Sequence, residues 1–161
     1  MRGVPERLAW IGDGAPRMEI AHIETCGPQL VARGTQLGAT YELRYRLKPD
    51  ALWLELVGER ERELRLDGAD FFDLGWSPLF NSLPVLRDRL LEDGRARDYR
   101  MCWVDVPSLE ATISEQRYEP LGDGVVRFRA GDFSSDIQFD SAGFVINYPG
   151  IAVRAATSGG L

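Results

Sequence analysis

The chain has 161 residues, of which 44% are hydrophobic and 27% are charged, a balance typical of one folded domain with its own core. Its formal net charge of −6 argues against a nucleic-acid duplex as the main partner, because phosphate binding needs a positive field. The same charge argues against simple adsorption to an anionic lipid surface. Residues 1–10 hold no apolar core of a secretory signal, and no run has the length of a transmembrane helix, so we expect a cytoplasmic protein.

The cysteine and histidine content predicts no metal and no cofactor. The chain holds two cysteines, Cys26 and Cys102, and one histidine, His22, which falls short of the four ligands of a typical zinc site. We expect both cysteines to be reduced, and the sequence leaves open whether they pair. His22 is predicted to be a structural histidine whose hydrogen bonds are satisfied.

Short strands separated by turns dominate the chain. Residues 1–18 contain several Gly and Pro residues and are predicted to be irregular, and Gly34 and Gly38 are expected to bracket a turn. The clearest strand is 40–47, where aromatic and aliphatic residues alternate strictly with charged ones, as in a half-buried antiparallel strand. Turn signals and alternation predict further strands at 19–24, 29–33, 52–57, 60–66, 99–104, 109–118, 126–130, 132–140, 144–148 and 151–154.

The stretch 71–85 interrupts these strands. It carries four aromatic residues, two prolines and an asparagine, which is more apolar mass than a turn needs. The two prolines favour extended geometry at the residues before them, Ser77 and Leu83. We therefore expect at most a turn or one short helical turn over 79–82, with Ser77 able to cap it.

The residues after Pro84 fit both a helix and a strand. Four leucines between 83 and 91 fit one face of a helix, whereas the surrounding rhythm is that of strands, so helix and strand stay open for 83–92. Strands spaced by turns, with at most a short helix near 77–92, predict an all-β roll or barrel-like domain. Similar meanders after Ala39 and after Tyr99 suggest a duplicated unit. We expect a single domain over 1–161, with its core at about 10–154 and a disordered tail at 155–161.

Several motifs resemble a known family. They are Asp-Leu-Gly-x-Ser-Pro-x-x-Asn-Ser-Leu-Pro at 73–84, Trp-Val-x-x-Pro at 103–107, Gln-x-Tyr at 116–118 and Asn-Tyr-Pro-Gly at 147–150. In order and spacing they are similar to the bacterial family of putative glycolipid-binding domain proteins, from about Trp10 to Arg154. The resemblance implies a long antiparallel sheet curled into a spiral β-roll. It also implies a strand near 83–92, which we favour for the C-terminal end of that segment.

The resemblance and the unusual stretch together give a candidate ligand site. A curled sheet has a concave face that can hold an apolar or amphipathic ligand, and aromatic rings beside polar groups suit the headgroup of a glycolipid. The candidate ligand-binding residues are Asp73, Trp76, Phe80, Asn81, Arg87, Trp103 and Tyr118. The family usually has polar residues where this chain has Phe71 and Phe80, so a pocket here is expected to be more apolar.

Each candidate also has a structural explanation. The tryptophans are more often core packing than ligand contacts, Asn81 can bond the backbone of its own turn, and Asp73 can pair with Arg87. The leading hypothesis is a non-enzymatic protein that binds a lipid or glycolipid. The alternative is a structural or interaction module that pairs through a sheet edge or the aromatic stretch, with a homodimer as one form. A hydrolase or isomerase using paired carboxylates, such as Asp132 and Asp136, ranks last.

Overall fold

The structure is a computed structural model that describes residues 6–26, 29–48 and 52–155, without the side chains of Cys26 and Gln29. The tail expected to be disordered falls outside this part of the chain, except for its first residue. The side chain of Cys26, whose pairing the sequence leaves open, also lies outside the described part, whereas Cys102 is a free, half-buried thiol.

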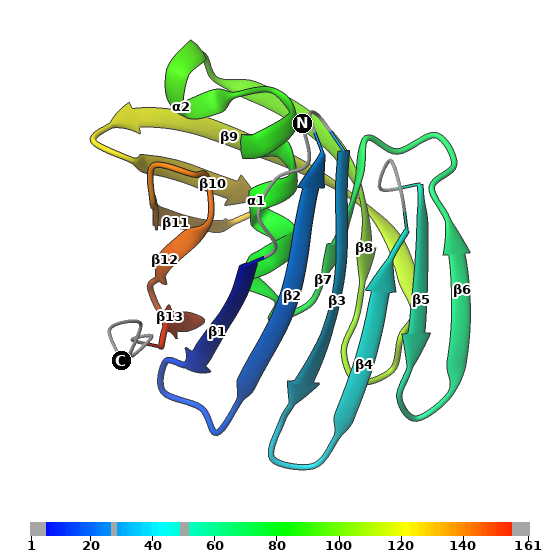
Figure 1. Cartoon of the computed structure of the whole chain (residues 1–161). Helices are drawn as coiled ribbons and strands as arrows, with labels where there is room; N and C mark the ends of the chain where they lie inside the picture. Colours follow the sequence, from blue (N-terminus) through cyan, green and yellow to red (C-terminus); the bar gives the residue numbers. More distant parts are fainter. Residues whose placement is uncertain (1–5, 27–28, 49–51, 156–161) are drawn as a thin grey trace.

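Thirteen strands of the described residues form one curled sheet (Figure 1). Its spatial order is β6-β5-β4-β3-β2-β1-β13-β12-β11-β10-β9-β8-β7. The strands are β1 (Glu6–Gly12), β2 (Met18–Cys26), β3 (Gln29–Leu37), β4 (Glu42–Leu47), β5 (Trp53–Val57), β6 (Glu61–Arg65), β7 (Phe71–Leu74), β8 (Arg97–Val104), β9 (Ala111–Gly122), β10 (Val125–Ala130), β11 (Phe133–Phe139), β12 (Val145–Tyr148) and β13 (Ala152–Arg154).

The sheet consists of two meanders, β1 to β6 and β8 to β13, which join where β1 pairs with β13. All neighbouring strands are antiparallel except β7, which runs parallel to β8. The two ends of the sheet, β6 and β7, do not pair with each other, so the sheet is curled but not closed. The prediction of an all-β roll is confirmed.

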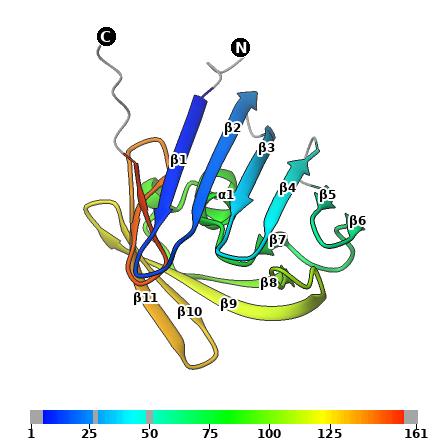
Figure 2. The same cartoon turned by 90° about the horizontal axis from the view of Figure 1, so that it is seen from below.

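Helix α1 (Pro78–Arg87) lies on the concave side of this sheet, between the two arms that the meanders form (Figure 2). Eight of its residues are buried, and its Phe80 ring packs edge-on against Tyr45 of β4, with 5.4 Å between the ring centroids. A short helix, α2 (Leu90–Asp93), follows it. The core of the protein therefore lies between α1 and the inward-facing side chains of both meanders.

Alternation decides which side chains of the first meander point inward. In β4 the residues Leu43, Tyr45 and Leu47 are buried while their neighbours are exposed, as the sequence pattern predicts. Gly34 pairs directly with Tyr45, and the Tyr45 ring occupies the space that a Cβ atom at this position would need. Gly34 therefore lies inside β3 and not at a turn, which corrects that expectation.

Three local predictions for the stretch 71–85 and the residues after it are wrong. The helix α1 covers Pro78–Arg87, which is longer than the one helical turn expected at most over 79–82. Residues 83–87 belong to α1 and 90–93 to α2, so the C-terminal part is helical and not a strand, and Leu83 is not extended. Burial of almost the whole of α1 outweighs the local cost of Pro84 within the helix. Ser77 is extended as predicted, but its hydroxyl makes no cap bond because it donates to Glu19.

The N-terminal segment also differs from the prediction. Residues 6–12, expected to be irregular, form β1, whose Trp10 is 1% exposed. The Trp10 indole donates a hydrogen bond to the Val145 carbonyl at 2.9 Å, so β1 is fixed to the second meander through a side chain as well as through β13. Among the described residues there is no helix long and apolar enough to cross a membrane.

Candidate functional site

A cavity of about 510 Å³ opens beside the turn between β7 and α1. The strands β8, β9 and β10 and residues of β11 and β12 form the rest of its wall. Five aromatic rings line it: Phe128 and Tyr148 are buried, Trp103 is half-buried, and Trp76 and Phe133 are exposed. The cavity therefore has an apolar interior and an aromatic rim.

A buried polar pair lies within this apolar wall. Asp73 of β7 and Gln116 of β9 are 8% and 4% exposed, and the Gln116 amide donates from Nε2 to Asp73 Oδ2 at 2.7 Å. Burial raises the pKa of Asp73 to about 6, although the Gln116 hydrogen bond opposes this. Gln116 Oε1 has no hydrogen-bond partner among the described residues, so the cavity wall holds one unsatisfied acceptor.

Further polar groups surround this pair. Ser114, Ser77, Asn81 and Asp105 also line the cavity. Asn81 is already bonded, since its Nδ2 donates to the Tyr118 hydroxyl at 3.2 Å. The cavity thus offers both donors and acceptors along its wall. Within the described ranges there is no cluster of three or more histidine, cysteine or acidic side chains that could hold a metal ion.

A second buried carboxyl group fixes the turn at the cavity rim. Glu19 of β2 accepts hydrogen bonds from Ser77 Oγ at 2.8 Å, Gln36 Nε2 at 3.1 Å and the Tyr45 hydroxyl at 3.2 Å. Gln36 also donates to the Gly75 carbonyl at 3.2 Å. These contacts hold the residues on both sides of Trp76. Burial raises the pKa of Glu19 to about 7, against the effect of its hydrogen bonds.

Trp76 itself has an unusual backbone. Its φ is 65°, in the left-handed region that bulky side chains rarely occupy. The Arg17 guanidinium lies 4.3 Å from the centre of its ring. An exposed, strained tryptophan held by a buried network is the kind of feature that occurs at ligand sites.

Four of the seven predicted site residues line this cavity: Asp73, Trp76, Asn81 and Trp103. The other three do not line it, and the site proposed below does not include them. Phe80 is 1% exposed and packs on Tyr45, and Tyr118 is fully buried behind the cavity wall. Arg87 is at the far end of α1.

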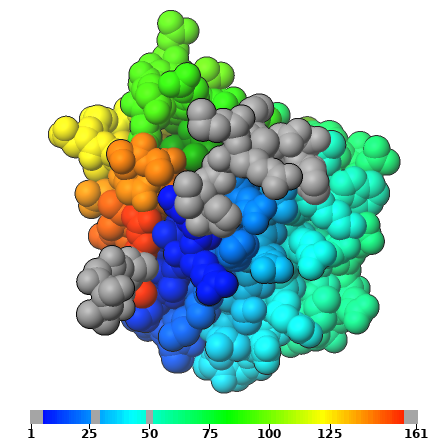
Figure 3. All heavy atoms as spheres, in the orientation of Figure 1, coloured from blue at the N-terminus to red at the C-terminus, as the bar shows by residue number. Residues whose placement is uncertain are grey.

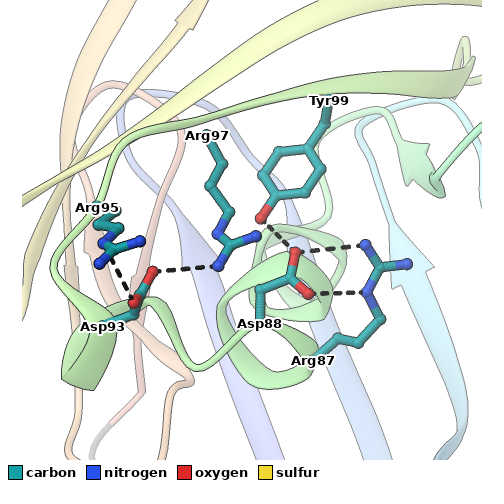
Figure 4. Close-up of polar contacts among 6 residues, drawn as sticks. All are labelled: Arg87, Asp88, Asp93, Arg95, Arg97 and Tyr99. Carbon is teal, nitrogen blue, oxygen red and sulfur yellow. Dashed lines mark hydrogen bonds and ion pairs between the residues drawn. The ribbon is translucent and has the colours of Figure 1, made fainter.

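Arg87 belongs to a separate group of charged side chains (Figure 4). Its guanidinium contacts Asp88, with Nε 3.1 Å from Oδ1, and lies 4.0 Å from the centre of the Phe71 ring. Asp88 also accepts a hydrogen bond from the Tyr99 hydroxyl at 2.6 Å. Asp73, which we considered as an ion-pair partner of Arg87, bonds to Gln116 instead.

Gln116 and Glu19 were not among the predicted site residues. Gln116 stands two positions before Tyr118, so strand alternation places both on the same face, and the motif that contains them could have suggested Gln116. For Glu19 no such signal exists, because an acidic residue in an alternating strand is usually expected on the exposed face.

Comparisons with known proteins agree with this fold. Residues 36–154 match the family model described as "Putative glycolipid-binding". The structure resembles the crystal structure of a DUF1089 family protein from Pseudomonas aeruginosa, with a TM-score of 0.60 and 22% identity over 96% of this chain and 91% of that one. A comparison with curated proteins finds no significant match.

The family match covers most of the chain and includes the turn between β7 and α1 and the strands that line the cavity. It begins in β3, later than the resemblance that we expected from about Trp10. At 22% identity the crystal structure supports the fold alone. On the family match, this chain belongs to the Putative glycolipid-binding family.

Proposed function

We propose that the protein binds a glycolipid, or a similar amphipathic molecule with a hydroxylated headgroup, in the cavity beside Trp76. The observation that carries this proposal is the unsatisfied Gln116 Oε1 next to the buried Asp73 carboxyl, in a cavity that five aromatic rings line. A buried acceptor without a partner costs free energy. This oxygen is covered, but a turn of the Gln116 side chain, which lines the cavity, would bring it to a ligand hydroxyl that donates to it and removes that cost.

The size and lining of the cavity support the same proposal. A volume of about 510 Å³ is within the usual range of small-molecule sites, which are mostly apolar with a few placed polar groups. Aromatic rings can cover the apolar faces of a sugar, and Phe133 with Ile113, both exposed, extends the apolar surface toward solvent, where an alkyl chain would lie. The cavity favours ligand binding over a purely structural module. We further propose that the whole chain acts as a single domain, since one sheet and one hydrophobic core contain the described strands.

The proposal can be tested with n-octyl-β-glucoside below its micelle concentration, titrated into the protein by isothermal calorimetry. We expect saturable binding that weakens in Trp76→Ala, because this ring forms the rim. Arg87→Ala is the matched control, since Arg87 lies outside the cavity and its loss should leave the affinity unchanged. A detergent with the same chain and a zwitterionic headgroup tests the role of the sugar hydroxyls.

The results separate three cases. Binding of the glucoside that weakens only in Trp76→Ala, with weaker binding of the zwitterionic detergent, supports the proposal. Equal binding of both detergents would mean that the cavity recognises the alkyl chain and not the headgroup. No saturable binding, or an equal loss in Arg87→Ala and Trp76→Ala, would contradict the site.

A further inference from the structure

The outer face of the first meander carries a row of basic side chains that the sequence does not reveal. The strand register places Arg7, His22, Arg33 and Arg46 side by side across β1 to β4. Arg44 of β4 stands two residues from Arg46 on the same face, about 7 Å away along the strand. We call Arg7, Arg33, Arg44 and Arg46 the arginine group.

These arginines line a shallow hollow of about 840 Å³ whose floor includes Gly34. All four are exposed. Within the described part of the chain, none of them forms an ion pair. Glu55 lies opposite Arg46 in the strand register and lines the same hollow, but its carboxylate contacts Lys48 Nζ at 2.7 Å, and Glu24 lies 3.6 Å from His22. The net charge of the chain is −6, so this group is a local exception to the overall charge.

His22 lies in the same row as three of these arginines. It was expected to be a structural histidine with satisfied hydrogen bonds, but its Nδ1 is covered and has no partner among the described residues. It lines the same hollow as the arginine group.

An apolar row runs parallel to the arginine group on the same face. The register places Val153, Ile11, Met18 and Leu37 side by side across β13, β1, β2 and β3. They are between 43% and 50% exposed, and the neighbouring Ile20 is 52% exposed. Figure 3 shows this side of the molecule, where β1 to β5 form one broad surface coloured blue to cyan.

We propose that this face docks on the surface of an anionic lipid bilayer. Guanidinium groups bind lipid phosphates through paired hydrogen bonds, and the aliphatic row would enter the boundary between headgroups and acyl chains. Charge complementarity decides the occupant, because a second copy on this face would bring unpaired arginines close to one another. Docking involves none of the residues that line the cavity, so it does not depend on the cavity.

The test is co-sedimentation of the protein with vesicles of phosphatidylcholine, with and without phosphatidylglycerol. Each arginine near an anionic surface contributes about 1 kcal/mol, or roughly fivefold in partitioning. We expect Arg33→Glu to reduce binding to the phosphatidylglycerol vesicles at least fivefold, and Arg33→Glu combined with Arg46→Glu to reduce it further. The matched control is Arg129→Glu, which makes the same change in net charge at an exposed position of β10.

The dependence of vesicle binding on salt and a variant beside the apolar row test the two parts of the proposal separately. Raising NaCl from about 0.1 M to 1 M shortens the Debye length from about 10 Å to about 3 Å, so binding should fall with salt. Ile20→Ser should reduce binding without changing its dependence on salt. In Arg33→Glu the affinity for octyl glucoside should stay unchanged, which separates this proposal from that of the cavity.

Three results would overturn the proposal. They are no binding to phosphatidylglycerol vesicles, equal binding to both kinds of vesicle, and an equal loss in Arg33→Glu and Arg129→Glu. If light scattering instead shows a dimer that Arg33→Glu abolishes, and vesicles do not bind, the face belongs to a second copy of the chain.

Discussion

Replacing Glu19 by Gln tests the buried network behind the cavity rim. Glu19 is 2% exposed, and burial raises its pKa from 4.5 to about 7. In the window between these values the folded protein keeps a proton that the unfolded chain releases. The stabilisation is therefore complete below about pH 4.5 and is lost as the pH rises through about 7. The whole effect amounts to about 3 kcal/mol, because one pKa unit corresponds to about 1.4 kcal/mol.

Gln keeps the size of Glu19 and has no charge to desolvate. The hydroxyl groups of Ser77 and Tyr45, which now donate to Glu19, can rotate to accept hydrogen bonds from the new amide. We therefore expect Glu19→Gln to raise the free energy of unfolding, relative to the natural chain, by roughly 2–3 kcal/mol more at pH 8 than at pH 5. Asp73 titrates in both proteins, so its contribution cancels in this comparison.

The measurement is urea unfolding at both pH values, followed by tryptophan fluorescence. Glu115→Gln is the matched control, because Glu115 is exposed on β9 and should give the same difference at both pH values. An equal change in the free energy of unfolding at about pH 5 and pH 8 would show that the Glu19 carboxyl does not titrate between these pH values. That result would contradict a pKa raised by burial.

Three further predictions concern the cavity. Trp76→Gly removes a backbone strain of roughly 1–2 kcal/mol together with the buried half of a ring that is 46% exposed, so the urea midpoint should change little while octyl glucoside affinity falls; a much lower midpoint with unchanged affinity would contradict this. Asp73 is ionised above about pH 6 and then accepts ligand hydroxyls more strongly, so calorimetry should show affinity rising through that pH in the natural chain but not in Asp73→Asn. Phe80→Leu should cost about 1 kcal/mol of stability with affinity unchanged, since a loss of affinity at equal stability would place Phe80 in the site.

The strands could be predicted because their signal is local. In β4 every second residue is apolar, and those residues are the buried ones. The turn residues between strands follow equally local rules. The prediction failed for α1, because the rules for Pro84 and for the residue before it describe an isolated chain. In the folded protein eight of the ten residues of α1 are buried on the concave side of the sheet. The free energy of this burial stabilises the helix, and it depends on tertiary contacts that local sequence rules do not include.

The candidate site was predictable in part for the same reason. The motif that ends at Pro84 contains Asp73, Trp76 and Asn81, which lie within a few residues of one another and line the cavity together. Glu19 lies 58 positions before Ser77, and the arginine group comes from three different strands. Contacts between strands that are distant in the sequence depend on the register and the curl of the sheet, which alternation alone does not specify.

The most direct test of the proposed function is native mass spectrometry of the protein purified from its own host, followed by a denatured run after extraction with organic solvent. We predict an additional mass in the native spectrum that disappears on extraction, carries a sugar by fragmentation, and is reduced in Trp76→Ala but not in Arg87→Ala. A clean unliganded mass in the natural chain, together with no saturable binding of octyl glucoside, would contradict the proposal.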